Sequence, residues 1–154
     1  MVAISNLLRV GLLVFLCIGW WTGLGFSKAI AIASPANQPV VSEVQVHLGT
    51  QAGELKFVPD QLEFEADKRY KLVLDNPSPE KHYFTAKDFA DGIWTQKVEA
   101  GNVEVKGAVH ELELKPGAIA EWFFIPLKTG TYELHCSIPG HAEAGMKGTI
   151  RILN

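Results

Sequence analysis

The C-terminal stretch HCSIPGHAEAGMKG, residues 135–148, places a cysteine, a histidine and a methionine at even spacing. Four residues separate Cys136 from His141, and four more separate His141 from Met146. Thiolate and thioether sulfur select Cu(I), imidazole suits Cu(I) and Cu(II) alike, and hard cations prefer carboxylate oxygens. These side chains therefore predict a copper site.

A second imidazole is missing from this stretch, and His82 is the best candidate for it. His82 follows the turn NPSP at the end of the candidate strand RYKLVLDN, where a sandwich gathers its loops. Two histidines and one cysteine in a trigonal plane, with a weak axial methionine, form the blue-copper geometry of electron-transfer sites. We predict one copper ion with His82, Cys136 and His141 in the plane and Met146 in the axial position.

Each of these residues also has a purely structural interpretation. Cys136 fits a buried inert thiol, and Met146 fits an ordinary core side chain. His82 fits a surface or capping histidine. The spacing of the C-terminal three favours ligands, because a cysteine, a histidine and a methionine meet here in one loop after a predicted strand.

The elements that must position these residues are predicted to be short strands. Apolar and polar residues alternate with period two and are interrupted by Pro and Gly about every ten residues, which predicts an all-β, antiparallel Greek-key sandwich or barrel. The candidate strands are residues 40–48, 54–59, 61–66, 69–76, 82–89, 110–117, 119–127, 131–136 and 148–153. Residues 93–98 fit either a strand or a helical turn.

The period-two phase also sorts the side chains around the site. In TYELHC, Tyr132, Leu134 and Cys136 share the apolar, inward face, and His135 points outward. His47 and His110 are expected to be strand residues that face solvent. His110 shares its face with leucines and is therefore expected to be partly buried.

The N-terminal segment, residues 1–33, reads as a targeting signal. It has no acidic residue and two basic ones, with a central apolar run and the small-residue pattern Ala31-Ile32-Ala33, so we predict a signal peptide cleaved near Ala33. An uncleaved membrane anchor is the alternative. Cleavage would remove Cys17 and leave Cys136 unpaired in a compartment where thiols usually form disulfides; a bound metal would protect it. Residues 34–40 are a linker to one domain, residues 41–154.

The chain resembles the cupredoxins, the type 1 copper proteins that include plastocyanin, azurin and auracyanin. The resemblance rests on His82 after a strand and turn, and on YELHCSIPGHAEAGMKG; it covers roughly residues 41–154. Many cupredoxins carry an asparagine after the first histidine, which tethers the two ligand loops. Tyr83 stands there in this chain, so the hydrogen bonding around the metal must differ. The segment from residue 83 to 109 is also long, with the unusual aromatics Phe89 and Trp94.

These observations predict an exported, monomeric one-electron carrier that docks transiently with redox proteins, in a periplasm or a thylakoid lumen. Residues 34–154 carry seventeen acids and twelve bases, a net charge of −5, which argues against nucleic-acid binding. His141 would be the electron port, beside an apolar patch of Ile138 and Pro139. We expect no enzyme. The alternatives are a Cu(I) delivery protein and, through His135 as a ligand to a second copper, a nitrite-reductase-like enzyme.

Overall fold

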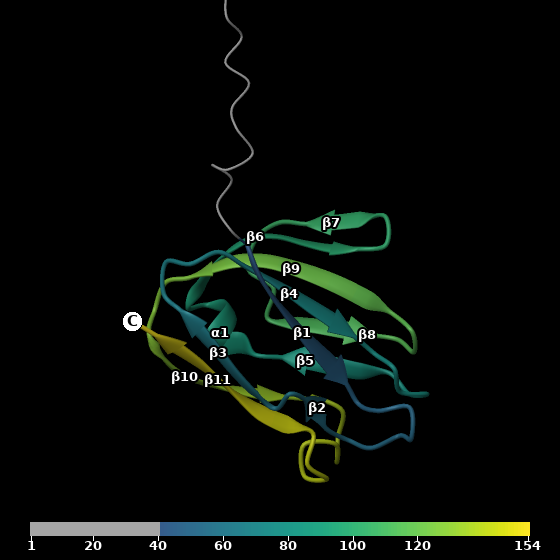
Figure 1. Cartoon of the computed structure of the whole chain (residues 1–154). Coiled ribbons are helices and arrows are strands. Elements are labelled where there is room, and N and C mark those ends of the chain that lie inside the picture. The colour runs from purple at the N-terminus through teal and green to yellow at the C-terminus, as the bar shows by residue number, and fades with distance from the viewer. Residues whose placement is uncertain (1–40) are drawn as a thin grey trace, which may run out of the picture. The chain divides into compact units, whose positions relative to one another are not determined.

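The computed structural model describes residues 41–154 (Figure 1). The predicted signal peptide and linker, residues 1–33 and 34–40, lie outside the described residues. Among the described residues, no helix is long and apolar enough to span a membrane. In chain order the elements are β1 (Ser42–Leu48), β2 (Phe57–Val58), β3 (Gln61–Glu65), β4 (Tyr70–Asp75), β5 (His82–Thr85), α1 (Lys87–Ala90), β6 (Ile93–Ala100), β7 (Val103–Val105), β8 (Glu111–Leu114), β9 (Ile119–Pro126), β10 (Gly130–His135) and β11 (Lys147–Leu153).

The strands form two sheets that pack face to face, as the alternating sequence pattern predicts. The first sheet has the order β2-β1-β4-β9-β6-β7, and the second has the order β3-β11-β10-β5-β8. The two strands next to the predicted ligands, β5 (which begins at His82) and β10 (which ends just before Cys136), belong to the second sheet and are neighbours in it. The fold therefore brings two segments that are far apart in the sequence to the same place.

The expectation of a purely antiparallel arrangement is wrong for two strand pairs. β1 runs parallel to β4, and β3 runs parallel to β11. Parallel neighbours need a long connection, and the chain supplies one between β1 and β4, where it forms β2 and then crosses to the second sheet as β3. Period-two alternation carries no information on strand direction, so the sequence pattern could not reveal this.

The candidate strand of residues 82–89 is also shorter than predicted. It ends at Thr85, and Lys87–Ala90 form the helical turn α1. Phe89 and Ala90 are both buried. Consecutive side chains of a strand point to opposite faces, so a strand could not turn both of them toward the core. A helical turn allows both side chains to point inward. The undecided segment after it is strand β6, whose Trp94 is 56% exposed.

An aromatic cluster fills the space between the sheets. Phe89 lies at its centre, with ring centroids 5.4 Å from Phe124, 5.8 Å from Phe64 and 6.0 Å from Trp122. Most of these contacts are edge-to-face, the arrangement that aromatic quadrupoles favour. The buried indole of Trp122 donates a hydrogen bond to Thr95 Oγ1 at 3.1 Å. The unusual Phe89 is therefore a core residue, and this core holds the second sheet rigidly against the first.

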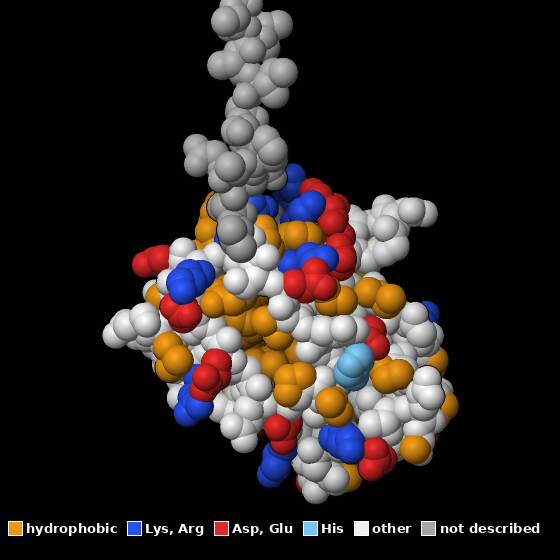
Figure 2. Space-filling model, viewed as in Figure 1, with side chains coloured by type: hydrophobic (Ala, Val, Ile, Leu, Met, Phe, Trp, Pro, Cys, Tyr) orange, Lys and Arg blue, Asp and Glu red, His pale blue; other side chains and the backbone are white. Residues whose placement is uncertain are grey.

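The outer surface carries mixed charge. Figure 2 shows apolar side chains gathered in the middle of one face, with acidic and basic side chains intermixed around them. Lys71 on β4, for example, lies 2.6 Å from the Glu43 carboxylate and 3.2 Å from that of Glu121. The ammonium of Lys71 is therefore balanced by two carboxylates.

Candidate metal centre

Three of the four predicted ligand residues converge at one end of the sandwich. His82 is the first residue of β5, Cys136 directly follows β10, and His141 lies in the loop between β10 and β11. One ligand atom from each lies within 4.8 Å of the others. Among residues 41–154, these three form the one such group of metal-binding side chains.

The loop between β10 and β11 is closed at its base by backbone hydrogen bonds. The Cys136 N–H donates to the Met146 carbonyl at 3.0 Å, and the Met146 N–H donates to the His141 carbonyl at 2.9 Å. Gly140 and Gly145 take left-handed φ values of +87° and +114°, which glycine adopts without strain. The hydrogen bonds place Met146 beside Cys136 with its side chain fully buried. Its axial role stays a prediction.

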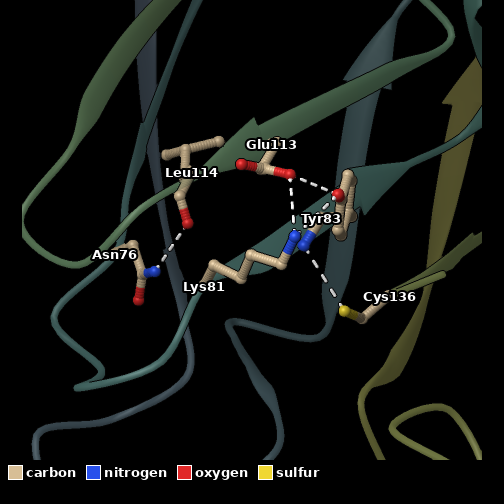
Figure 3. Close-up of polar contacts among 6 residues, drawn as sticks. All are labelled: Asn76, Lys81, Tyr83, Glu113, Leu114 and Cys136. Carbon is tan, nitrogen blue, oxygen red and sulfur yellow. Dashed lines mark hydrogen bonds and ion pairs between the residues drawn. The ribbon is translucent and has the colours of Figure 1, made fainter. Parts of the chain in front are cut away.

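The strand phase predicted for β10 is confirmed. Leu134 and Cys136 are buried, Tyr132 is half-buried and Glu133 is exposed. Cys136 is a free cysteine, only 1% exposed. Its Sγ accepts a hydrogen bond from the Tyr83 backbone N–H at 3.3 Å (Figure 3) and lies 3.7 Å from His141 Nδ1.

His82 is the most unusual residue of the group, because it is completely buried yet forms no side-chain hydrogen bond. Neither ring nitrogen has a partner among the described residues. A buried polar group without a partner costs about 1–3 kcal/mol. The His82 and His141 ring centroids are only 5.3 Å apart. A metal ion between these rings and the Cys136 sulfur would satisfy the orphaned nitrogens, so the donor set fits a soft metal such as copper.

The electrostatics keep His82 in the form that binds metals. Burial lowers the pKa of His82, and the neighbouring His141 lowers it further, while Glu80 opposes the shift. A lowered pKa keeps the imidazole neutral to more acidic pH, and only the neutral ring offers a lone pair to a metal.

The remaining histidines lie apart from this group. His47 Nδ1 lies 2.7 Å from the Asp75 carboxylate, and His110 Nε2 lies at the same distance from the Asp91 carboxylate. The partial burial expected for His110 is wrong: it is exposed, because β8 begins one residue later and the strand phase does not reach it. His135 is half-buried on the outer side of β10, with Nδ1 3.4 Å from Glu133.

Sequence reasoning missed two residues that shape the site, Gly49 and Asn76. A Cβ at Gly49 would lie 2.9 Å from His82 Nε2, and Gly49 has a φ of +79°. No local pattern marks that glycine, because its contact is with a ring 33 positions away. Asn76 stands in the recognised turn NPSP, but the partner of its side chain across the fold, Leu114, could not be read from that turn.

A β-sandwich with two histidines and a buried cysteine gathered at one end has the architecture of a mononuclear copper protein. Residues 44–153 match the family described as copper binding proteins, plastocyanin/azurin family. The chain belongs to this family and is a cupredoxin. The predicted all-β Greek-key sandwich is thereby confirmed, and copper is the metal that the His–Cys–His group is suited to hold.

Individual relatives include both small and large copper proteins. The chain is 31% identical over 134 residues to the chloroplastic plastocyanin of Fritillaria agrestis, covering 82% of this chain and 74% of that protein. It is 29% identical over 105 residues to the multicopper oxidase mco of Staphylococcus epidermidis, covering 64% of this chain. This chain spans about a quarter (24%) of the length of the multicopper oxidases it matches.

Solved structures show the same fold. The dithionite-reduced auracyanin of Roseiflexus castenholzii superimposes with a TM-score of 0.54 at 16% identity, covering 75% of this chain and 99% of that one. The copper nitrite reductase of Nitrosomonas europaea gives a TM-score of 0.54 at 17% identity, covering 79% of this chain and 53% of that one. At these identities the likeness concerns the fold alone.

Proposed function

We propose that this protein is an exported one-electron carrier that holds a single copper ion between His82, Cys136 and His141, with Met146 as the axial ligand. The convergence of the first three residues within 4.8 Å, at one end of a rigid sandwich, carries the proposal. Membership in the plastocyanin/azurin family supports it. Copper, when bound, supplies the one-electron couple between Cu(I) and Cu(II).

The chain's own residues prepare the donors before the metal arrives. Cys136 and His82 are fixed by burial, and the Tyr83 N–H holds the cysteine sulfur in place. A hydrogen bond to the sulfur also withdraws electron density from it, which favours the reduced metal. Because the donors are held by the packed sheets, little has to rearrange when an electron moves, as fast electron transfer requires.

His141 is the proposed electron port. It is half-buried, whereas His82 and Cys136 are buried, so it is the donor that lies nearest to solvent. Beside it, Ile138 is half-buried and Pro139 is exposed. An apolar patch of this kind suits a small, transient contact with a redox protein. We propose that the protein acts as a monomer in a periplasm or a thylakoid lumen, after export by residues 1–33.

The proposal includes no catalytic turnover. His135 belongs to no group of three metal-binding side chains among residues 41–154. A second copper at His135, as a nitrite-reductase-like enzyme would need, therefore has no further ligands in the part of the chain that the structure describes.

The deciding experiment is copper loading of the purified protein. We expect Cu(II) to produce an intense visible absorption from thiolate-to-copper charge transfer, which disappears on reduction and returns on oxidation. The same treatment of Cys136→Ser is the control and should give no such band. A colourless protein that binds Cu(I) tightly and rejects Cu(II) would refute the electron-carrier proposal in favour of copper delivery.

A further inference from the structure

Asn76 is buried beside the metal end of the sandwich and uses every polar atom of its side chain. It is 1% exposed. Its Nδ2 donates to the Leu114 carbonyl at 2.8 Å, a contact drawn in Figure 3, and to the Glu80 carbonyl at 2.7 Å. Its Oδ1 accepts the Ser78 N–H at 2.9 Å. A buried side chain with three hydrogen bonds, two of them fully buried, holds the surrounding backbone in a single arrangement.

The backbone of Asn76 joins the same region. Its N–H donates to the Ala118 carbonyl at 3.0 Å, and its carbonyl accepts the Gly117 N–H at 2.8 Å. One residue therefore fastens the loop that follows β4 to the connection between β8 and β9. The loop runs on directly into His82.

The contact with Leu114 bears directly on His82. In the pairing of β5 with β8, Leu114 is the register partner of His82. Asn76 thus holds the backbone position that lies opposite His82 in the sheet, while Ser78 and Glu80, its other two partners, belong to the chain just before that histidine. The Asn76 side chain therefore links the segment before His82 to the residue that pairs with His82 on β8.

The ring of His82 needs such outside support, because no hydrogen bond of its own orients it. It packs instead against the Gly49 backbone: a Cβ built on Gly49 would lie 2.9 Å both from His82 Nε2 and from Ser78 Cβ. The Ser78 side chain and the His82 ring therefore share one surface. Because Asn76 holds the Ser78 amide, it also holds a residue that lies against the same glycine as the ring.

We infer that Asn76 is a positioning residue for the copper site, which holds His82 in the geometry that binds the metal. The inference rests on the proposed ligand role of His82. It places the support of this ligand in the loop before the strand, and not in the side chain that follows His82.

Tyr83 supplies the contrast. Its backbone N–H contacts Cys136, but its phenol bonds to the Glu113 carboxylate and accepts from Lys81 Nζ at 3.3 Å (Figure 3). Both partners are exposed: Glu113 lies on β8, and Lys81 directly precedes β5. The Tyr83 phenol therefore bonds away from the metal centre, and loss of its Glu113 partner should leave the centre unchanged.

The test compares Asn76→Ser and Asn76→Asp with wild type, in the full chain. Copper affinity is measured by competition with chelators for both Cu(I) and Cu(II), together with the charge-transfer spectrum and the urea stability of the metal-free form. Loss of support around a metal ligand typically weakens binding by roughly 10- to 100-fold. We expect a loss of that size for both variants, with an altered charge-transfer spectrum.

Two control variants make the result specific. Glu113→Ala removes the carboxylate partner of the Tyr83 phenol and leaves Tyr83 itself in place, so it should keep the wild-type copper affinity and spectrum. Thr95→Val removes the buried acceptor of the Trp122 indole in the other sheet; it should lower stability without changing copper binding. Asn76→Asp keeps an acceptor for the Ser78 N–H but turns a carboxylate oxygen toward the Leu114 and Glu80 carbonyls, so it is the more disruptive change. The smaller, uncharged Asn76→Ser remains for measurement if Asn76→Asp does not fold.

The outcomes separate the two proposals. Asn76 variants that lose stability like Thr95→Val, but bind copper with wild-type affinity and spectrum, would overturn the positioning role. Weakened binding in Glu113→Ala equal to that in the Asn76 variants would overturn it too. If wild type itself gives no charge-transfer band, the electron-carrier proposal fails, and the Cu(I) affinities of the same variants still decide the role of Asn76.

Discussion

Replacement of His82 by leucine should make the metal-free protein more stable while it destroys the copper site. The imidazole is fully buried, and both of its ring nitrogens lack hydrogen-bond partners among the described residues. Each such group costs about 1–3 kcal/mol. Leucine fills a similar volume with no polar atom, so we expect the free energy of unfolding of the metal-free variant to rise by about 1–3 kcal/mol.

Copper should reverse this order. A ligand that binds only the folded state adds about 4 kcal/mol of stability at a free concentration roughly 1,000 times its Kd. Wild type gains that increment and the leucine variant does not. The loaded wild type should therefore be the more stable protein by about 1–3 kcal/mol, the difference between these two estimates.

Urea denaturation at pH 8, with and without copper and in the presence of a chelator for the metal-free samples, measures both differences. At this pH the His82 ring is neutral in the folded and unfolded states, because the pKa of an unfolded histidine is about 6.5. A metal-free His82→Leu protein that is less stable than wild type would show that the ring nitrogens are not orphaned. Retention of the charge-transfer band in this variant would remove His82 from the ligand set.

Four further predictions concern the same site. The pKa of His82 is lowered in the folded state, so the unfolded chain binds more protons than the folded chain below about pH 6.5. Urea denaturation should therefore show that metal-free wild type loses stability as the pH falls through that value. The His82→Leu variant should lose less stability over the same pH range. Cys136→Ser should abolish the visible band of the copper protein, since the thiolate is its source; a persistent band would contradict the ligand assignment. Met146→Leu should keep the band and raise the reduction potential, measured by redox titration, because loss of a donor destabilises Cu(II) more than Cu(I). Gly49→Ala should destabilise the protein by about 1–2 kcal/mol from its positive φ and also weaken copper binding, because the new Cβ would meet His82 Nε2 at 2.9 Å. Gly53→Ala, which has the same φ of +79° and open space around it, should show the stability loss alone.

The local part of the site could be predicted from the sequence. Cys136 and His141 lie in one loop between two neighbouring strands, so their spacing alone brings them together. The inward phase of Cys136 followed from the two residues before it at period two, Leu134 and Tyr132. The chemistry of these donors is a property of the residue types and does not depend on the fold.

The sequence pointed to His82 as a candidate ligand but could not show that it lies beside Cys136 and His141. His82 was found because the copper geometry required a second imidazole, yet the sequence pattern does not say that β5 lies beside β10. Period-two alternation reports which face of a strand is buried; it does not report which strand is its neighbour, or in which direction that neighbour runs. The parallel pairing of β1 with β4 was missed for this reason.

What the sequence by itself determined is the class of fold, the metal and the residues that we propose as its donors, because these follow from periodicity and from the chemistry of side chains. The tertiary structure alone decided what surrounds them. One such feature is the burial of His82 without hydrogen bonds to the described residues. The approach of Gly49 to its ring and the bond from Asn76 to Leu114 each join residues more than thirty positions apart. Such contacts depend on how two sheets pack, and no local pattern of residues encodes them.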